Sequence, residues 1–137
     1  MKVLIDSNVV LDILLNNIDF YNNSMAVFVH AEQNRITGYI SASAITDIYY
    51  IARKKLGKAL ARDAVKKMLY VFQPATVTGD EIFKALDLDW GDFEDSVQFV
   101  VGSNLSVDYI ITRNTNDFSS GNIPAVTPEE FINIITT

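Results

Sequence analysis

The sequence predicts an α/β protein with a mostly parallel central sheet between two layers of helices. Continuous apolar runs, as in residues 2–5 and 108–112, are typical of buried parallel strands. Longer segments of helical periodicity separate these runs, and this alternation predicts a three-layer α/β/α architecture of the Rossmann-like kind. No internal repeat or linker interrupts it, so residues 1–137 are expected to form a single domain.

The first half of the chain is expected to contain two strands and four helices. Ser41 or Ser43 can cap the third helix, and Gly57 is placed to end it, because glycine adopts a positive φ at little steric cost. The expected strands are residues 2–5 and 37–40, and the expected helices are 9–15, 19–33, a third that ends near 56, and 58–71.

The second half continues the alternation after Pro74, which breaks the fourth helix. Thr78 can cap a helix that ends near residue 86. Thr127, Pro128 and the two acids that follow them indicate the start of a terminal helix. The remaining expected elements are strands at 75–77, 108–112 and 125–126 and a helix at 92–103.

The composition excludes several classes of protein. The chain has no cysteine, so disulfide frameworks and thiolate chemistry are not available, and we expect a cytoplasmic location. No apolar stretch approaches the roughly 20 residues that span a bilayer. A net charge of −6 argues against broad electrostatic capture of nucleic acid.

The charges are unevenly distributed along the chain. Seven of the 11 basic residues lie between residues 53 and 67, and seven of the 17 acidic residues lie between residues 80 and 95. Two interpretations of the basic segment remain open: a pair of solvated helix faces, or a patch that follows a phosphate backbone. The second gains support only if the acids form a site.

Four aspartates lie where a metal site would need them. Asp6 ends the first strand and Asp117 follows the strand at residues 108–112, while Asp47 and Asp95 lie in helical segments. Active sites in parallel sheets form at the carboxyl ends of strands. A carboxylate there costs desolvation free energy unless a positive group compensates it. Hard cations such as Mg²⁺ and Mn²⁺ prefer carboxylate oxygens, and one histidine with no cysteine makes a zinc site unsuitable.

Each of these acids also has a simpler interpretation. Asp6 can cap the helix that follows it, and Asp117 can belong to an Asx turn. Asp92 can complement the dipole at a helix N-terminus. Asp47 lies well inside a helix, where its neighbours at i−4 and i+4, Ser43 and Ile51, suggest a partly buried face.

Taken together, the motifs resemble those of the PIN-domain ribonucleases, which include the VapC-type toxins of bacterial toxin–antitoxin pairs. The resemblance extends over essentially the whole chain, with the motifs in the family's order. The segments that carry it are residues 3–12 (Val-Leu-Ile-Asp-Ser-Asn-Val-Val-Leu-Asp), 43–49, 94–98, 111–118 and the tail 123–131.

The resemblance implies an acidic Mg²⁺ or Mn²⁺ site built from Asp6, Asp47, Asp95 and Asp117. Asp47 stands where the family more often has Glu, and Asn114 stands where some relatives carry Asp. Asp92, one helical turn before Asp95, is the substitute ligand. Residues implied to orient ligands or bound water are Asn8, Thr112 and Asn114.

The function implied is a Mg²⁺- or Mn²⁺-dependent endoribonuclease, a toxin that forms a homodimer and is inhibited by a cognate antitoxin. Metal-activated water would hydrolyse RNA phosphodiesters. The alternative is a non-catalytic interaction module of the same fold with weak or no metal binding. Phosphoryl-transfer domains with a strand-end aspartate fit poorly, because Asn8 stands where a second carboxylate would be needed. The residues expected to steer the RNA are Arg53, Lys54, Lys58, Arg62 and Arg113.

Overall fold

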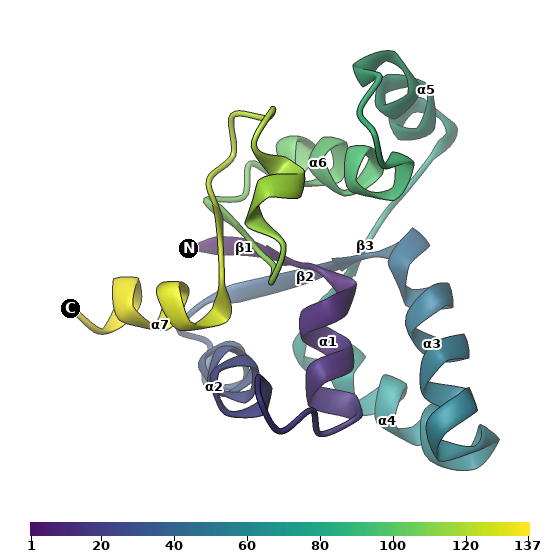
Figure 1. The fold of residues 1–137 in the computed structure, drawn as a ribbon, viewed down its shortest axis with the longest axis vertical. Helices are drawn as coiled ribbons and strands as arrows, with labels where there is room; N and C mark the ends of the chain where they lie inside the picture. The colour runs from purple at the N-terminus through teal and green to yellow at the C-terminus, as the bar shows by residue number, and fades with distance from the viewer.

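The computed structural model describes residues 1–137 and has a central sheet of five parallel strands in the order β3-β2-β1-β4-β5 (Figure 1). The predicted α/β class is therefore confirmed. The strands are β1 (Lys2–Ile5), β2 (Thr37–Ser41), β3 (Gln73–Ala75), β4 (Tyr109–Ile111) and β5 (Ala125–Val126).

Helices cover both faces of the sheet. Side chains alternate between the faces along β1: Val3 and Ile5 belong to the larger core cluster, and Leu4 belongs to the smaller one. The larger cluster contains residues of α1 (Ser7–Leu14), α2 (Tyr21–Glu32), α3 (Ala42–Leu56), α4 (Lys58–Val71) and α7 (Pro128–Thr136). The smaller cluster lies under α5 (Gly79–Leu88) and α6 (Phe93–Leu105), with a short 3₁₀ helix, η1 (Thr115–Phe118), at its edge.

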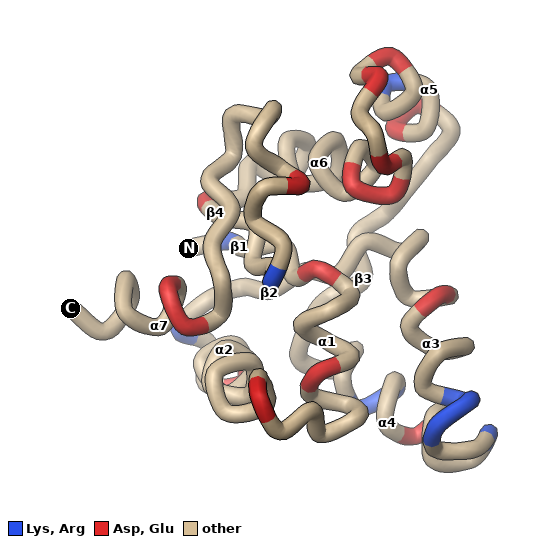
Figure 2. Tube along the Cα trace, in the orientation of Figure 1, with Lys and Arg blue, Asp and Glu red and all other residues tan.

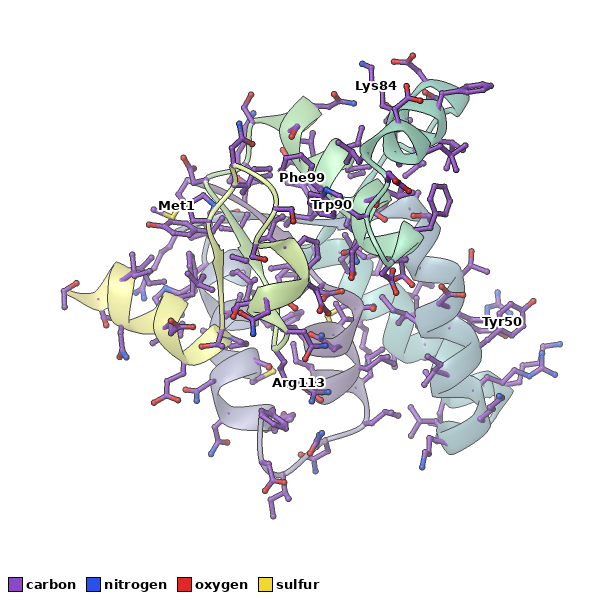
Figure 3. All side chains as sticks on the ribbon, turned by 45° about the horizontal axis from the view of Figure 1, so that its top comes forward. Met1, Tyr50, Lys84, Trp90, Phe99 and Arg113 are labelled. Atoms are coloured by element: carbon purple, nitrogen blue, oxygen red, sulfur yellow. The ribbon has the colours of Figure 1, made fainter.

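Aromatic rings fill part of the smaller cluster. The ring centroids of Trp90 and Phe99 are 4.9 Å apart (Figure 3). Trp90 also contacts Phe118 edge-on. Trp90 therefore closes the core beneath the loop that leads into α6. None of the helices combines the length and the apolar character that a membrane span requires.

The strand order changes direction at β1, and this change determines where a site can form. β2 and β3 extend the sheet on one side of β1, whereas β4 and β5 extend it on the other. Helices leave the carboxyl ends of adjacent strands in opposite directions at such a point, so a crevice opens there. Asp6 follows β1 directly, and Thr112 follows β4.

The elements differ from the sequence-based expectation mainly at their ends. The third strand is residues 73–75 instead of 75–77, so Pro74 lies inside it. This is possible because β3 is an edge strand, where a missing N–H need not disrupt the ladder. The helix expected at 9–15 begins at Ser7, because Asp6 is its N-cap, and η1 was not predicted.

Candidate active site

Asp6 is the best-connected carboxylate at the carboxyl edge of the sheet. It is only 5% exposed, and it caps α1 by accepting a hydrogen bond from the Ser7 backbone N–H at 2.7 Å. Its second carboxylate oxygen accepts a hydrogen bond from the Thr112 hydroxyl at 2.7 Å. The capping interpretation is therefore correct, and it does not exclude a functional role.

Asn8 and Thr112 form the network that surrounds Asp6. The Asn8 amide nitrogen donates to Asp6 Oδ2 at 3.2 Å, and its oxygen accepts from the Arg113 backbone N–H at 3.3 Å. The Thr112 hydroxyl accepts from the Asn114 backbone N–H at 3.0 Å. Both side chains thus connect β1 to the segment after β4, whereas the Asn114 side chain makes no hydrogen bond to the protein.

Gln98 provides a further contact to Asp6 that the sequence motifs did not reveal. It lies on α6, is fully buried, and donates from Nε2 to Asp6 Oδ1 at 3.0 Å. Its Oε1 atom is buried without a hydrogen-bond partner. Since buried polar groups are normally paired, an amide with one unmet oxygen is best explained by its contact with the carboxylate. The sequence carried two signals: Gln98 ends the motif segment 94–98, and it is a glutamine between the apolar residues Val97 and Phe99.

Asp95 lies near Asp6 at the start of α6. Burial, together with the negative charges of Asp92, Asp6, Asp117 and Glu94, raises the pKa of Asp95 to about 7. Its carboxylate accepts no hydrogen bond from the protein. The Asp92 carboxylate, by contrast, accepts from the Asp95 backbone N–H at 3.0 Å and caps α6.

Glu94 belongs to the same acidic group, although the sequence analysis did not place it in the metal site. Burial first, and then the charges of Asp47, Asp6 and Asp92, raise its pKa. Asp6 and Asp92 are therefore close enough to influence both Glu94 and Asp95, while Asp47 influences Glu94 and Asp117 influences Asp95.

Asp47 and Asp117 are the outer members of this group, and both are exposed. The partly buried face expected for Asp47 was wrong, because Ser43 and Ile51 lie on the same exposed side of α3. The buried residues of this helix are instead Ala44, Ile48 and Ala52. Asp117 lies in η1, and its side chain makes no hydrogen bond, so the Asx-turn interpretation was also wrong.

The ligand atoms of the acidic group suit a hard divalent cation, but the carboxylates stand too far apart to bind one. All of its donors are oxygens, which hard cations prefer. Burial and four like charges disfavour the ionised form of Asp95, and a cation would offset both effects. However, no three His, Cys, Asp or Glu side chains stand close enough together to hold a metal ion. Binding would require the more exposed carboxylates to move toward Asp6 and Asp95.

The basic residues expected to steer RNA are at a distance from the acids, except for Arg113. Arg53 follows Asp47 by six residues, which is about 9 Å along the helix axis. Figure 2 shows this basic group at the end of α3 that is remote from the sheet, and at the start of α4. Four exposed side chains from the predicted set lie there: Arg53, Lys54, Lys58 and Arg62.

Arg113 lies beside the acidic group, but its charge is already partly neutralised. Its Nε atom is 2.8 Å from Oδ2 of Asp12, an ion pair without good hydrogen-bond alignment. The Asp12 side chain is 3% exposed and also accepts a hydrogen bond from Asn17 at 3.0 Å. The guanidinium carbon lies 4.4 Å from the ring centroid of Phe20. The burial of Asp12 could not be inferred from its place in the opening motif.

Comparison with known proteins agrees with the fold and with the motifs. A family model for the PIN domain matches residues 2–116. This is well over half of the chain, and the chain therefore belongs to the PIN domain family. The family resemblance seen in the sequence is confirmed.

Two solved structures share the fold at low sequence identity. One is VapBC2 from Rickettsia felis bound to a DNA fragment from their promoter, where the match covers 93% of this chain and 98% of that chain, with 15% identity and a TM-score of 0.70. The other is a toxin–antitoxin complex from Klebsiella pneumoniae, with 92% and 97% coverage, 20% identity and a TM-score of 0.68. No curated protein matches the chain.

Proposed function

We propose that this protein is a Mg²⁺- or Mn²⁺-dependent endoribonuclease and the toxin of a toxin–antitoxin pair. The observation that carries the proposal is the acidic group around Asp6, at the crevice between the carboxyl ends of β1 and β4. Membership of the PIN family and the two toxin–antitoxin complexes of the same fold support it.

In this proposal, Asp6 and Asp95 hold the cation, and Asp47 and Asp117 complete the site from its two sides, with Asp92 as a reserve ligand. A bound divalent cation would lower the pKa of water and offset charge on the scissile phosphate. Thr112, Asn8 and Gln98 keep the Asp6 carboxylate oriented through their hydrogen bonds. Glu94 adds negative charge on the Asp47 side.

The proposal extends to the partners. Several apolar side chains of α3 and α4 face solvent, among them Tyr70 at 79% exposure and Tyr50 at 55%. Figure 3 shows Tyr50 pointing away from the protein. Where such side chains form a contiguous patch, the patch is typical of a surface that a partner covers. The proposed partners are a cognate antitoxin and a second copy of the chain.

The test uses single-stranded RNA in Mn²⁺ with purified protein. Asp6→Asn and Asp95→Asn are each expected to lower the cleavage rate by at least about 100-fold, because each removes a charge that would bind the cation. Asp63→Asn, a change at an exposed acid of α4, is the control and should cleave at the wild-type rate. Wild-type rates for both site variants would contradict the proposal.

A second function is favoured by one observation: no three ligand side chains stand close enough together to hold a metal. The chain would then be a non-catalytic interaction module of the same family. Titration calorimetry and thermal unfolding separate the two functions. With millimolar Mn²⁺, a non-catalytic module should give no heat of binding and no rise in melting temperature.

A further inference from the structure

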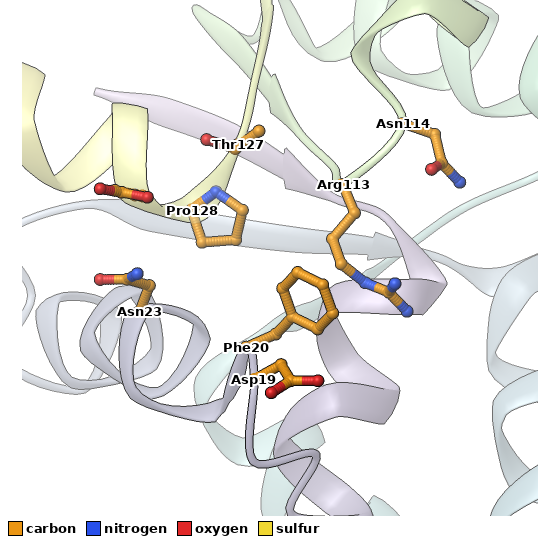
Figure 4. A pocket seen from close by; sticks show the side chains of 8 residues that line it. Asp19, Phe20, Asn23, Arg113, Asn114, Thr127 and Pro128 are labelled. Atoms are coloured by element: carbon orange, nitrogen blue, oxygen red, sulfur yellow. The ribbon is translucent and has the colours of Figure 1, made fainter.

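A pocket of about 350 Å³ lies next to the acidic group, between the N-terminal ends of α2 and α7 and the segment after β4 (Figure 4). In this view Phe20 stands between Pro128 and the side chain of Arg113. Pockets of this volume are within the range that binds small organic groups. Its lining residues have no part in the acidic site described above, apart from Asn114 and Arg113.

The pocket and the acidic group share one wall. Thr112 donates to Asp6, and the next two residues, Arg113 and Asn114, line the pocket. The backbone N–H groups of Arg113 and Asn114 are held by Asn8 Oδ1 and by the Thr112 hydroxyl. The pocket therefore begins one residue after the side chain that bonds to Asp6.

The charges of the lining disfavour a phosphate as the occupant. Asp19 and Glu129 contribute two carboxylates, and the single cation, Arg113, already has Asp12 at 2.8 Å. An anion would meet net repulsion here. A neutral group with several hydrogen-bond donors would instead find free acceptors.

The polar side chains that line the pocket are free to form hydrogen bonds with a ligand. The ring of Phe20 and the guanidinium of Arg113 lie beside them. The side chains of Asp19, Asn23, Asn114 and Glu129 make no hydrogen bond or ion pair within the protein. Phe20 is 39% exposed although the Arg113 guanidinium lies over its ring. Aromatic and guanidinium planes stack on unpaired bases, while amides and carboxylates bond to base edges.

We propose that this pocket binds the RNA base next to the scissile phosphate and prefers guanine, whose Watson–Crick edge offers the most donors. The inference rests on the proposed ribonuclease function, since it assigns the sequence preference of that activity. Asn23 is a specificity residue, and the Phe20–Arg113 pair is the stacking surface.

The binding test needs no metal and no catalysis. Side-chain amide signals of the full-length protein are followed by NMR in EDTA while 5′-GMP, 5′-UMP, inorganic phosphate or N-acetylarginine amide is added. GMP is expected to shift the Asn23 and Asn114 amides and to bind at least about fivefold more tightly than UMP. Asn23→Ala should weaken GMP binding by about tenfold, as the loss of one hydrogen bond to a ligand does. Asn22→Ala, an exposed change on the same helix outside the pocket, should not.

Equal shifts with GMP and inorganic phosphate would overturn the inference, as would shifts with the arginine compound alone, which would indicate a basic peptide as the occupant. Cleavage of an RNA pool of random sequence separates the two proposals. If the wild type cleaves and Asn23→Ala keeps the same sequence profile, the pocket assignment is wrong. If the wild type cleaves nothing while GMP binds as described, the ribonuclease proposal fails and the base pocket stands.

Discussion

Asp95 is the residue whose protonation should respond most clearly to pH. Its pKa in the folded protein, about 7, lies above its ordinary value of 3.8. Between these values the folded state binds more protons than the unfolded state, so the free energy of unfolding falls as the pH rises. Without metal, the protein should therefore lose stability between pH 4 and pH 7 through this group.

The measurement is the melting temperature in EDTA at pH 5 and pH 8. Asp95→Asn should raise it more at pH 8 than at pH 5, because the substitution removes a charge that is unfavourable only when ionised. Asp63→Asn, at an exposed position, serves as the control. An equal effect of Asp95→Asn at both pH values would show that its carboxylate titrates normally.

Gln98 should affect Mn²⁺ binding, because it orients Asp6, and should have little effect on the free energy of unfolding. Gln98→Met keeps the volume and removes the donor to Asp6 Oδ1 together with the unpaired Oε1. Mn²⁺ affinity is expected to fall by about tenfold, as for other residues that orient a ligand. The free energy of unfolding in urea should stay within about 1 kcal/mol, because both unfavourable burial and one hydrogen bond are lost.

Gln33→Met, at an exposed position, is the matched control for both measurements. A loss of stability with unchanged Mn²⁺ affinity would make Gln98 a structural residue only.

At the scale of the elements, β2 packs closely against Phe72, the residue that follows α4, only because residue 38 is glycine. A Cβ atom at Gly38 would lie 2.6 Å from Cδ1 of the fully buried Phe72. Gly38→Ala should therefore lower the free energy of unfolding by about 1–3 kcal/mol, since the ring has little room to move. Gly79→Ala, in the first turn of α5 with open space around it, should be neutral or stabilising. Urea unfolding measures both, and equal stability of the two variants would contradict this packing argument.

The element boundaries follow local signals wherever side chains interact with nearby backbone. The terminal helix begins as predicted, with Thr127 accepting from the Glu130 N–H and Pro128 in the first turn. The position of β3 followed a different rule, because pairing with β2 places Pro74 opposite Ile40. A breaker residue was correctly identified, but its effect depended on whether the strand lay at the edge of the sheet.

For the whole molecule, the Asp12–Arg113 ion pair joins α1 to the segment after β4, residues that are distant in sequence. Arg113→Met should lower the free energy of unfolding by about 2 kcal/mol because it leaves Asp12 buried with Asn17 as its remaining partner. This is less than for a fully buried pair, since the Arg113 side chain is 33% exposed. Combining it with Asp12→Asn should recover part of the loss in a double-mutant cycle measured by urea unfolding. Additive effects would show that the pair does not couple the two segments.

The sequence by itself determined the α/β class, the strand-end position of Asp6 and the motifs of the PIN family. Periodicity and capping act over a few residues of chain, and the motifs are short segments whose order can be read directly from the sequence. Only the tertiary structure decided that Gln98 contacts Asp6, that Glu94 joins the acidic group, that Asp47 is exposed and that Asp12 neutralises Arg113. Those features depend on burial and on distances between segments up to about a hundred residues apart, and packing alone brings such segments together.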